Sequence, residues 1–210
     1  MKTVIKKDKW ERYDLFKHYD DETNPFIYIT IPVDVSNIYH YSKNNNVSFY
    51  CTMGYVLTKA INKVDGFKYR KEGDDIVYYD KINSNYTDMI TENRIGYFTI
   101  DYQENFHDYV VAFNEARMDL IAGKNKNVDV LNHDEVWLSC APWFNFNSLV
   151  TPFNKAVTIP QIIWDKFKKH DNQVEVNLMI MVHHGFIDGF QLNKAIKIIE
   201  EEINNFKGDE

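Results

Sequence analysis

The sequence is poor in cysteine and contains no apolar run long enough to cross a membrane. Its two cysteines, Cys51 and Cys140, form no C-x-x-C pair and no other spacing typical of a metal site, which predicts reduced thiols in a cytoplasmic protein. A membrane span needs roughly 18 apolar residues, and the charged N-terminus is unlike a signal peptide. We therefore expect a soluble, intracellular protein with no membrane partner.

Clustered positive charge is also missing. The chain has 24 Lys and Arg residues against 31 Asp and Glu residues, a formal net charge of -7, and its basic residues are scattered. Because a protein that follows a phosphate backbone needs a basic stripe, we expect no nucleic-acid partner. With 210 residues, 44% apolar content and no repeat or linker, the chain is predicted to form one domain over residues 1–210.

Residue spacing predicts a mixture of helices and strands. Pro32 cannot donate to a strand ladder, which favours an edge strand or the end of a strand, and Ser48 is a suitable helix N-cap. In the first half we predict a helical segment at 10–19, a strand at 26–35, a helix from Ser48 to Val64, hairpin strands at 67–70 and 76–79, and a strand at 97–102.

The second half begins with a helix at 106–121, followed by a loop that lasts to about Glu135. Strands are predicted at 136–140 and at 157–167, where Pro160 suits an edge or a bulge. Between them Phe144, Phe146 and Ser148 alternate with asparagines, which predicts an extended segment with these three side chains on one face.

The most apolar predicted strand runs from Val174 to His184. Its apolar residues fall two apart, so we expect one continuous buried face that His184 extends, with His183 on the opposite face. Gly185 and Gly189 bracket a tight turn that holds Asp188, and a helical pattern follows at once to Phe206.

Two histidines, two glycines and an acid within seven residues at the end of a buried strand indicate a functional turn. Imidazole has an unperturbed pKa near 6.5, so His184 is a candidate general base. One alternative is a histidine satisfied at a strand end, with Asp188 only capping the helix. A metal site of His183, His184 and Asp188 is another alternative, which the opposite-facing histidines disfavour, so we expect no metal.

The segment His184–Gly189 resembles the H-x-x-x-D-G motif of the chloramphenicol acetyltransferase family, within the coenzyme A-dependent acyltransferase superfamily. Trp10–Arg12 is similar to the opening W-x-R segment of that family, and Pro142–Ser148 is similar to its P-W-x-N-F-x-S segment. The resemblance implies an α/β two-layer sandwich, in which helices pack on one face of a large mixed sheet. It also implies a homotrimer with active sites between subunits.

The resemblance implies roles for four residues. His184 matches the base that deprotonates an acceptor hydroxyl for direct attack on acetyl-coenzyme A, the co-substrate. Ser148 matches the serine that stabilises the oxyanion, and Asp188 matches the aspartate that pairs with an arginine, here Arg12, to hold the histidine loop. The implied activity is O-acetyl transfer to chloramphenicol or a similar small hydroxylated molecule.

Departures from the family pattern fall mainly on the acceptor side. The resemblance places His18, Tyr19, Thr23 and Tyr97 around the acceptor, and His18 and Thr23 are more polar than the usual residues. Ile163 replaces a threonine that holds a water, and Phe167 replaces a tyrosine associated with the coenzyme. These changes leave two alternatives open: transfer to a different alcohol or amine, or a catalytically silent homologue that binds coenzyme A.

Overall fold

The computed structural model describes residues 1–124 and 131–208, so positions 125–130 of the predicted loop after Lys124 lie outside the described residues. The elements in chain order are β1 (Lys2–Val4), η1 (Lys7–Lys9), α1 (Tyr13–Asp20), β2 (Phe26–Asp34), α2 (Ser36–Asn44), α3 (Phe49–Ile61), η2 (Asp65–Lys68), β3 (Tyr69–Glu72), β4 (Asp75–Tyr79), β5 (Asn83–Thr91), β6 (Arg94–Ile100), α4 (Phe106–Ile121), β7 (Glu135–Ala141), β8 (Gln161–Asp165), β9 (Lys168–His170), β10 (Gln173–His183) and α5 (Gly189–Asn204).

A large mixed sheet forms the centre of the molecule, in the order β2-β10-β8-β7-β5-β6, with β9 paired to β10. The β5–β7 and β7–β8 pairs are parallel, and the other pairs are antiparallel. β2 is an edge strand with Pro32 near its C-terminal end, so it fits both placements that Pro32 favours. β1, β4 and β3 form a separate three-stranded antiparallel sheet.

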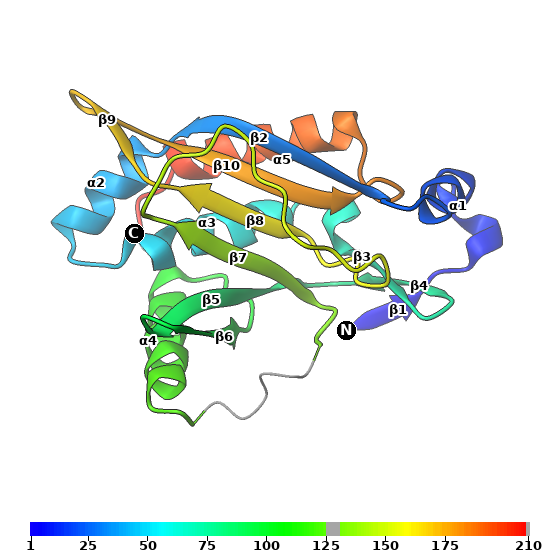
Figure 1. Ribbon diagram of the computed structural model, residues 1–210, viewed down its shortest axis with the longest axis horizontal. Helices are drawn as coiled ribbons and strands as arrows, with labels where there is room; N and C mark the ends of the chain where they lie inside the picture. Colours follow the sequence, from blue (N-terminus) through cyan, green and yellow to red (C-terminus); the bar gives the residue numbers. More distant parts are fainter. Residues whose placement is uncertain (125–130, 209–210) are drawn as a thin grey trace.

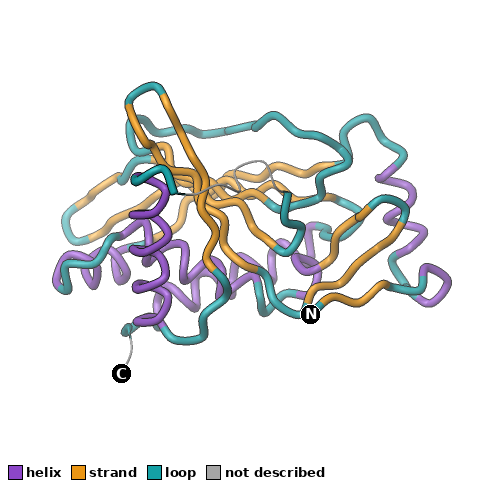
Figure 2. The backbone as a smooth tube through the Cα atoms, turned by 90° about the horizontal axis from the view of Figure 1, so that it is seen from below, coloured by secondary structure: helices purple, strands orange, loops and turns teal. Residues whose placement is uncertain are grey.

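The two faces of the large sheet are made by alternate residues of the same strands. In β5, β6, β7, β8 and β10, even-numbered residues face a buried apolar core that includes Tyr86, Leu138 and Leu178. α3 and α5 lie on this side, and the long loop between β7 and β8 crosses the opposite side, as Figures 1 and 2 show. We call the two sides the helix face and the outer face.

Gly54 brings α3 close to the sheet. A Cβ atom at Gly54 would lie 1.6 Å from the Tyr86 hydroxyl oxygen, so no larger residue fits there without movement. The Tyr86 hydroxyl lies 2.7 Å from that of Tyr109 in α4, which in turn lies 2.7 Å from the Ser84 hydroxyl. α3 and α4 therefore pack tightly on the helix face, and the buried hydroxyl groups of Ser84, Tyr86 and Tyr109 are hydrogen-bonded to one another.

Most predicted elements are present, including the Ser48 N-cap, whose side chain accepts a hydrogen bond from the Cys51 N–H. α2, β5 and the short strands β1 and β9 were not predicted. α3 ends at Ile61 rather than Val64, and β3 begins at Tyr69 because Phe67 belongs to η2. The predicted strand at 157–167 is confined to β8 in the sheet interior, with Pro160 just before it.

The predicted extended segment at 144–148 is wrong: residues 142–160 contain no strand. Phe146 is buried whereas Phe144 is 55% exposed, so the three side chains do not share a face. The reason is tertiary, because this stretch lies over the outer face of the sheet instead of pairing at its edge. None of the described helices is long and apolar enough to cross a membrane.

Candidate active site

The histidine turn, residues 183–189, joins β10 to α5. β10 ends at His183, and Phe186 N–H and Ile187 N–H both donate to the His183 carbonyl, which closes the turn. At Gly185 a Cβ atom would lie 2.7 Å from the Phe16 Cα atom, so α1 packs directly against the turn. Glycine is required here by this close approach of two backbones.

Arg12 holds the turn at two points. Its Nη1 atom donates to Asp188 Oδ2 at 3.0 Å, and its Nε atom donates to the Gly185 carbonyl at 3.4 Å. Asp188 also caps α5, because its Oδ1 atom accepts the N–H groups of Phe190 and Gln191. Burial opposes the charged carboxylate, but these hydrogen bonds and Arg12 outweigh it and hold the pKa of Asp188 below its ordinary value.

His184 lies in the turn and does not extend the apolar face of β10, contrary to the sequence-based expectation. Its N–H donates to the Pro25 carbonyl at 2.8 Å, and its ring stacks on Tyr19 with centroids 3.9 Å apart. Nδ1 is buried without a hydrogen-bond partner among the described residues, whereas Nε2 is not among the buried atoms. Nε2 is therefore the ring nitrogen that a substrate can reach.

His183 has different neighbours, as the strand pleat predicts. Its Nδ1 atom accepts the Gly185 N–H at 3.1 Å, which leaves the proton on Nε2, 3.7 Å from Asp20 Oδ1. The ring packs against Phe16 and Phe26, and burial lowers the pKa of His183 to about 4 despite the Asp20 carboxylate. His183 is thus a buried neutral side chain that supports the turn.

The predicted acceptor-side residues separate into two groups. Tyr19 and His18 lie at the end of α1, where His18 is exposed and its ring contacts Tyr19 with centroids 5.0 Å apart, and Thr23 is exposed in the following loop. Tyr97 lies instead on the outer face of β6, in a different part of the molecule. One chain therefore does not bring these four side chains together.

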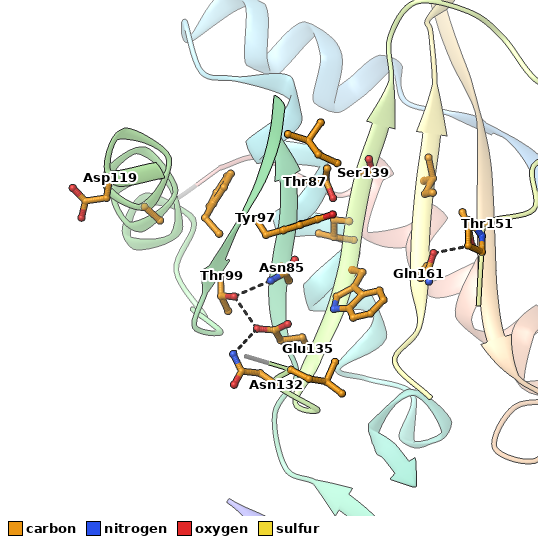
Figure 3. A pocket seen from close by; sticks show the side chains of 18 of the residues that line it. Asn85, Thr87, Tyr97, Thr99, Asp119, Asn132, Glu135, Ser139, Thr151 and Gln161 are labelled. Atoms are coloured by element: carbon orange, nitrogen blue, oxygen red, sulfur yellow. Dashed lines mark hydrogen bonds between the residues drawn. The ribbon is translucent and has the colours of Figure 1, made fainter. Parts of the chain in front are cut away.

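Tyr97 lines a pocket of about 1250 Å³ over β5, β6, β7 and β8 (Figure 3). Ile163 lines it too, and the polar residues that line it include Asn85, Thr87, Thr99, Ser139, Thr151 and Gln161. These polar residues were not predicted from the sequence, although in β7 and β8 Ser139 and Gln161 stand next to the apolar Leu138 and Ile162, which was a usable signal.

A hydrogen-bonded group lies at one end of this pocket. Glu135 Oε1 accepts from the Thr99 hydroxyl at 2.7 Å and from Asn132 Nδ2 at 3.1 Å, and Asn85 Nδ2 donates to Thr99 at 3.0 Å (Figure 3). Burial raises the pKa of Glu135, and these hydrogen bonds offset it only in part. The pocket is more polar than a site for a purely apolar ligand.

Ser148 is exposed in the loop over the outer face and has no hydrogen bond to another described residue. Its neighbour Phe146 is tied to Asn177, and Thr151 is tied to Gln161, which pairs with Met181. Further along the loop, the ring of Phe153 packs against Phe26, which contacts His183. Ser148 therefore lies beside the stretch of β10 between Asn177 and Met181, whereas the ring of His184 contacts Tyr19 beyond the end of the strand.

Phe167 lies at the other end of β10 from the histidine turn. Its ring packs edge-on against Tyr39 and Phe49, with centroids 5.0 and 4.7 Å away, and it is half-buried. Glu175, which pairs with the next residue, Lys168, is eight residues before His183, or about 26 Å along the strand.

No group of three or more His, Cys, Asp or Glu side chains within residues 1–124 and 131–208 is placed to hold a metal ion. The alternative set of His183, His184 and Asp188 does not converge, because the first faces Asp20 and the last faces Arg12. Both cysteines are free, with Cys51 buried and Cys140 partly exposed.

Comparisons with known proteins agree on one family. A sequence model of the chloramphenicol acetyltransferases matches residues 2–200. A chloramphenicol acetyltransferase from Staphylococcus aureus is 28% identical over 206 residues, which cover 94% of this chain and 93% of that protein. One from Clostridium perfringens is 26% identical over 217 residues, with 96% and 98% covered.

Two solved structures superpose on this chain over most of its length. A chloramphenicol acetyltransferase gives a TM-score of 0.83 at 22% identity and covers 97% of this chain and 100% of its own. A probable dihydrolipoamide acetyltransferase from Listeria monocytogenes gives a TM-score of 0.72 at 14% identity, with 91% and 90% covered. At these identities the superpositions establish a shared fold.

Proposed function

This chain belongs to the chloramphenicol acetyltransferase family and is an acyltransferase, and on that premise we propose that it transfers acetyl from acetyl-coenzyme A to a hydroxyl of chloramphenicol or a similar small molecule. The observation that carries the proposal is the histidine turn, where Nε2 of His184 stays open while Arg12 and Asp188 hold the backbone around it. A fixed imidazole with one free nitrogen is what general base catalysis needs.

In the proposed reaction Nε2 of His184 takes the proton of the acceptor hydroxyl as its oxygen attacks the thioester carbonyl carbon. The hydroxyl of Ser148 donates a hydrogen bond to the resulting oxyanion, a contribution typically worth about 3 kcal/mol of barrier. The carbon–sulfur bond then breaks, and the coenzyme A thiolate takes the proton back from His184. No acyl-enzyme forms, and Asp188 and Arg12 act only on the position of the turn.

We propose that the active site lies between subunits of a homotrimer. One row of paired residues runs across the sheet from Thr99, in the same strand as Tyr97, to Met181, in the strand that ends at the histidine turn. This row crosses four gaps between strands, a distance of about 19 Å. Because this exceeds the reach of a small acceptor, His184 of one subunit would act with Ser148 and the Tyr97 pocket of its neighbour. Exposed apolar side chains on this side, including Trp143, Phe144 and Val150, support a covered surface.

Phe167 is proposed to contact the coenzyme. Coenzyme A is long enough to extend well beyond the reacting thioester, so the distance between Phe167 and the histidine turn is compatible with this role. Acetyl-coenzyme A as donor and two free thiols also favour a cytoplasmic location.

The test is an assay of free thiol release from acetyl-coenzyme A with chloramphenicol as acceptor. We expect His184→Gln to lower kcat by about 10³-fold, because general base catalysis typically contributes 10² to 10⁴. His170→Gln is the matched control, since His170 is exposed in the β9–β10 hairpin. Chloramphenicol acetylation that survives His184→Gln would contradict the assignment of the base.

The polar pocket favours one second candidate, transfer to a different alcohol or an amine. The side chains of Asn85, Thr99 and Gln161 are suited to a hydrogen-bonding acceptor. A panel of hydroxylated and amino compounds in the same assay distinguishes the two candidates by kcat/KM. A chain that binds acetyl-coenzyme A but releases no thiol with any of them is a silent homologue.

A further inference from the structure

Asp165, the last residue of β8, carries a carboxylate that is 2% exposed on the outer face and has no ion-pair partner among the described residues. Four N–H donors converge on it instead. The Asn177 N–H donates to Oδ1 at 2.7 Å, and Oδ2 accepts from Asn177 Nδ2 at 3.0 Å, Asn145 Nδ2 at 3.2 Å and the Phe146 N–H at 3.2 Å. A buried charge needs this many donors to offset its desolvation.

Asp165 and Asn177 together bind both backbone groups of Phe146, its N–H and its carbonyl. Asn177 Nδ2, in β10, donates to the Phe146 carbonyl at 2.7 Å while Asp165 accepts the Phe146 N–H. The Phe146 ring is buried with Phe26, Met179 and Met181. The loop is therefore fixed to the sheet at Asn145 and Phe146, an arrangement we call the Asp165 clamp.

Ser148 lies two residues beyond the clamp. The next fixed point along the chain is Thr151, whose hydroxyl donates to Gln161 Oε1 at 2.8 Å. Since Ser148 has no hydrogen bond of its own to another described residue, these two anchors set where its hydroxyl lies. The Asp165 clamp is the stronger, because it fixes backbone as well as side-chain atoms.

We propose that Asp165 is a positioning residue that places the Ser148 hydroxyl for oxyanion stabilisation. This inference rests on the proposed function, in which Ser148 is the oxyanion donor. An asparagine at position 165 would have an amide NH₂ group in place of one carboxylate oxygen. In one orientation this NH₂ group would face the Asn177 N–H, and in the other it would face the three donors that now bind Oδ2, so asparagine cannot replace Asp165.

The experiment compares Asp165→Asn, Asn145→Ala and Asp34→Asn. Asn145 is exposed, and its variant removes one of the four donors to the carboxylate while Asp165 itself stays in place. Asp34 is the matched control, since it accepts three hydrogen bonds from Ser36 and Gln173 at the far end of β2. We expect Asp165→Asn to lower kcat about 10- to 100-fold with KM nearly unchanged, Asn145→Ala to lower it less, and Asp34→Asn to leave it unchanged.

Coupling to Ser148 separates positioning from a general structural role. In a Ser148→Ala background, Asp165→Asn is expected to cause no further loss of kcat, because the hydroxyl it places is gone. Amide hydrogen exchange in residues 144–148 is expected to be faster in Asp165→Asn, independently of any assay.

Losses that multiply in the double variant, unchanged exchange in residues 144–148, or an equal loss in Asp34→Asn would each overturn the inference. If Ser148→Ala keeps full activity, the proposed role of Ser148 fails, and the role of Asp165 fails with it. If the wild-type chain acetylates no acceptor, the proposed function itself fails, whatever the exchange shows.

Discussion

The helix face and the outer face of the large sheet alternate along the same strands, yet they differ in kind. On the helix face, Leu138, Ile162 and Leu178 are fully buried against helices. On the outer face Trp137, Ser139 and Ile163, which flank Leu138 and Ile162, are half-exposed and line a pocket, whereas Asn177 and Met179, which flank Leu178, are buried beneath the loop.

Alternate residues of one strand therefore have different roles: those on the helix face stabilise the fold, and those on the outer face lie near the proposed chemistry. Packing on the helix face holds the strands, so the outer face is free to carry polar groups, a loop and a pocket. His183 is the last outer-face residue of β10, and His184 is the first residue of the turn. The proposed base therefore lies where the regular alternation ends.

The largest expected effect concerns Ser148, on the outer-face loop. Ser148→Ala is expected to lower kcat by about 10² to 10³, as the loss of an oxyanion donor does. If the site is shared between subunits, trimers assembled from His184→Ala and Ser148→Ala chains regain activity, because about a quarter of random interfaces combine the two intact residues. Measuring thiol release from mixed and unmixed samples checks this, and no recovery on mixing would place both residues in one chain.

The next effect compares the two faces directly. Leu178→Ala, on the helix face, is expected to lower the free energy of unfolding by about 2–5 kcal/mol, because the cavity cannot collapse. Ile163→Ala, on the outer face, is expected to cost less than about half of that, since its side chain is partly exposed. Urea unfolding of both variants measures the difference, and equal losses would show that the outer face stabilises the fold as much as the core does.

A smaller effect is the pH dependence caused by His183. With its pKa lowered to about 4 in the folded chain, the unfolded chain binds a proton more readily between about pH 6.5 and pH 4. Its contribution to stability is therefore full above about pH 6.5 and falls as the pH is lowered, by about 2 kcal/mol between pH 7 and pH 5. Urea unfolding at both pH values should show a smaller pH difference for His183→Gln than for wild type and for the exposed control His170→Gln.

The smallest effect concerns the turn itself. Arg12→Met removes the contacts to Asp188 and the Gly185 carbonyl, and we expect kcat to fall about tenfold while the fold persists. The pKa of Asp188 should rise toward its ordinary value, so the stabilisation that wild type has above about pH 4 is reduced. Arg94→Met, at an exposed position in β6, is the control, and equal kcat values for the two variants would remove Arg12 from the site.

Some features of this protein followed from local sequence. The alternation in β10, the Ser48 cap, the turn glycines and the helix from Gly189 are set by backbone geometry and neighbouring residues, so spacing alone predicted them. The edge position of β2 is one of the two placements that the missing N–H of Pro32 favours. The contact between Arg12 and Asp188 was expected from the resemblance and not from spacing.

Other features depend on contacts between residues distant in sequence. The segment at 144–148 has the alternation of a strand, but Asp165 and Asn177 bind it as a loop, and only the folded chain brings those residues together. Likewise, the pocket that contains Tyr97 exists because four strands align their outer-face residues.

Local patterns thus predict which residues alternate, cap and turn, since those properties depend on backbone geometry over a few positions. Long-range packing sets which face of the sheet the helices cover, that His183 is buried while His184 is partly exposed, and that residues 144–148 form a loop. These depend on packing among strands and helices far apart in sequence, whose free energy no local pattern contains.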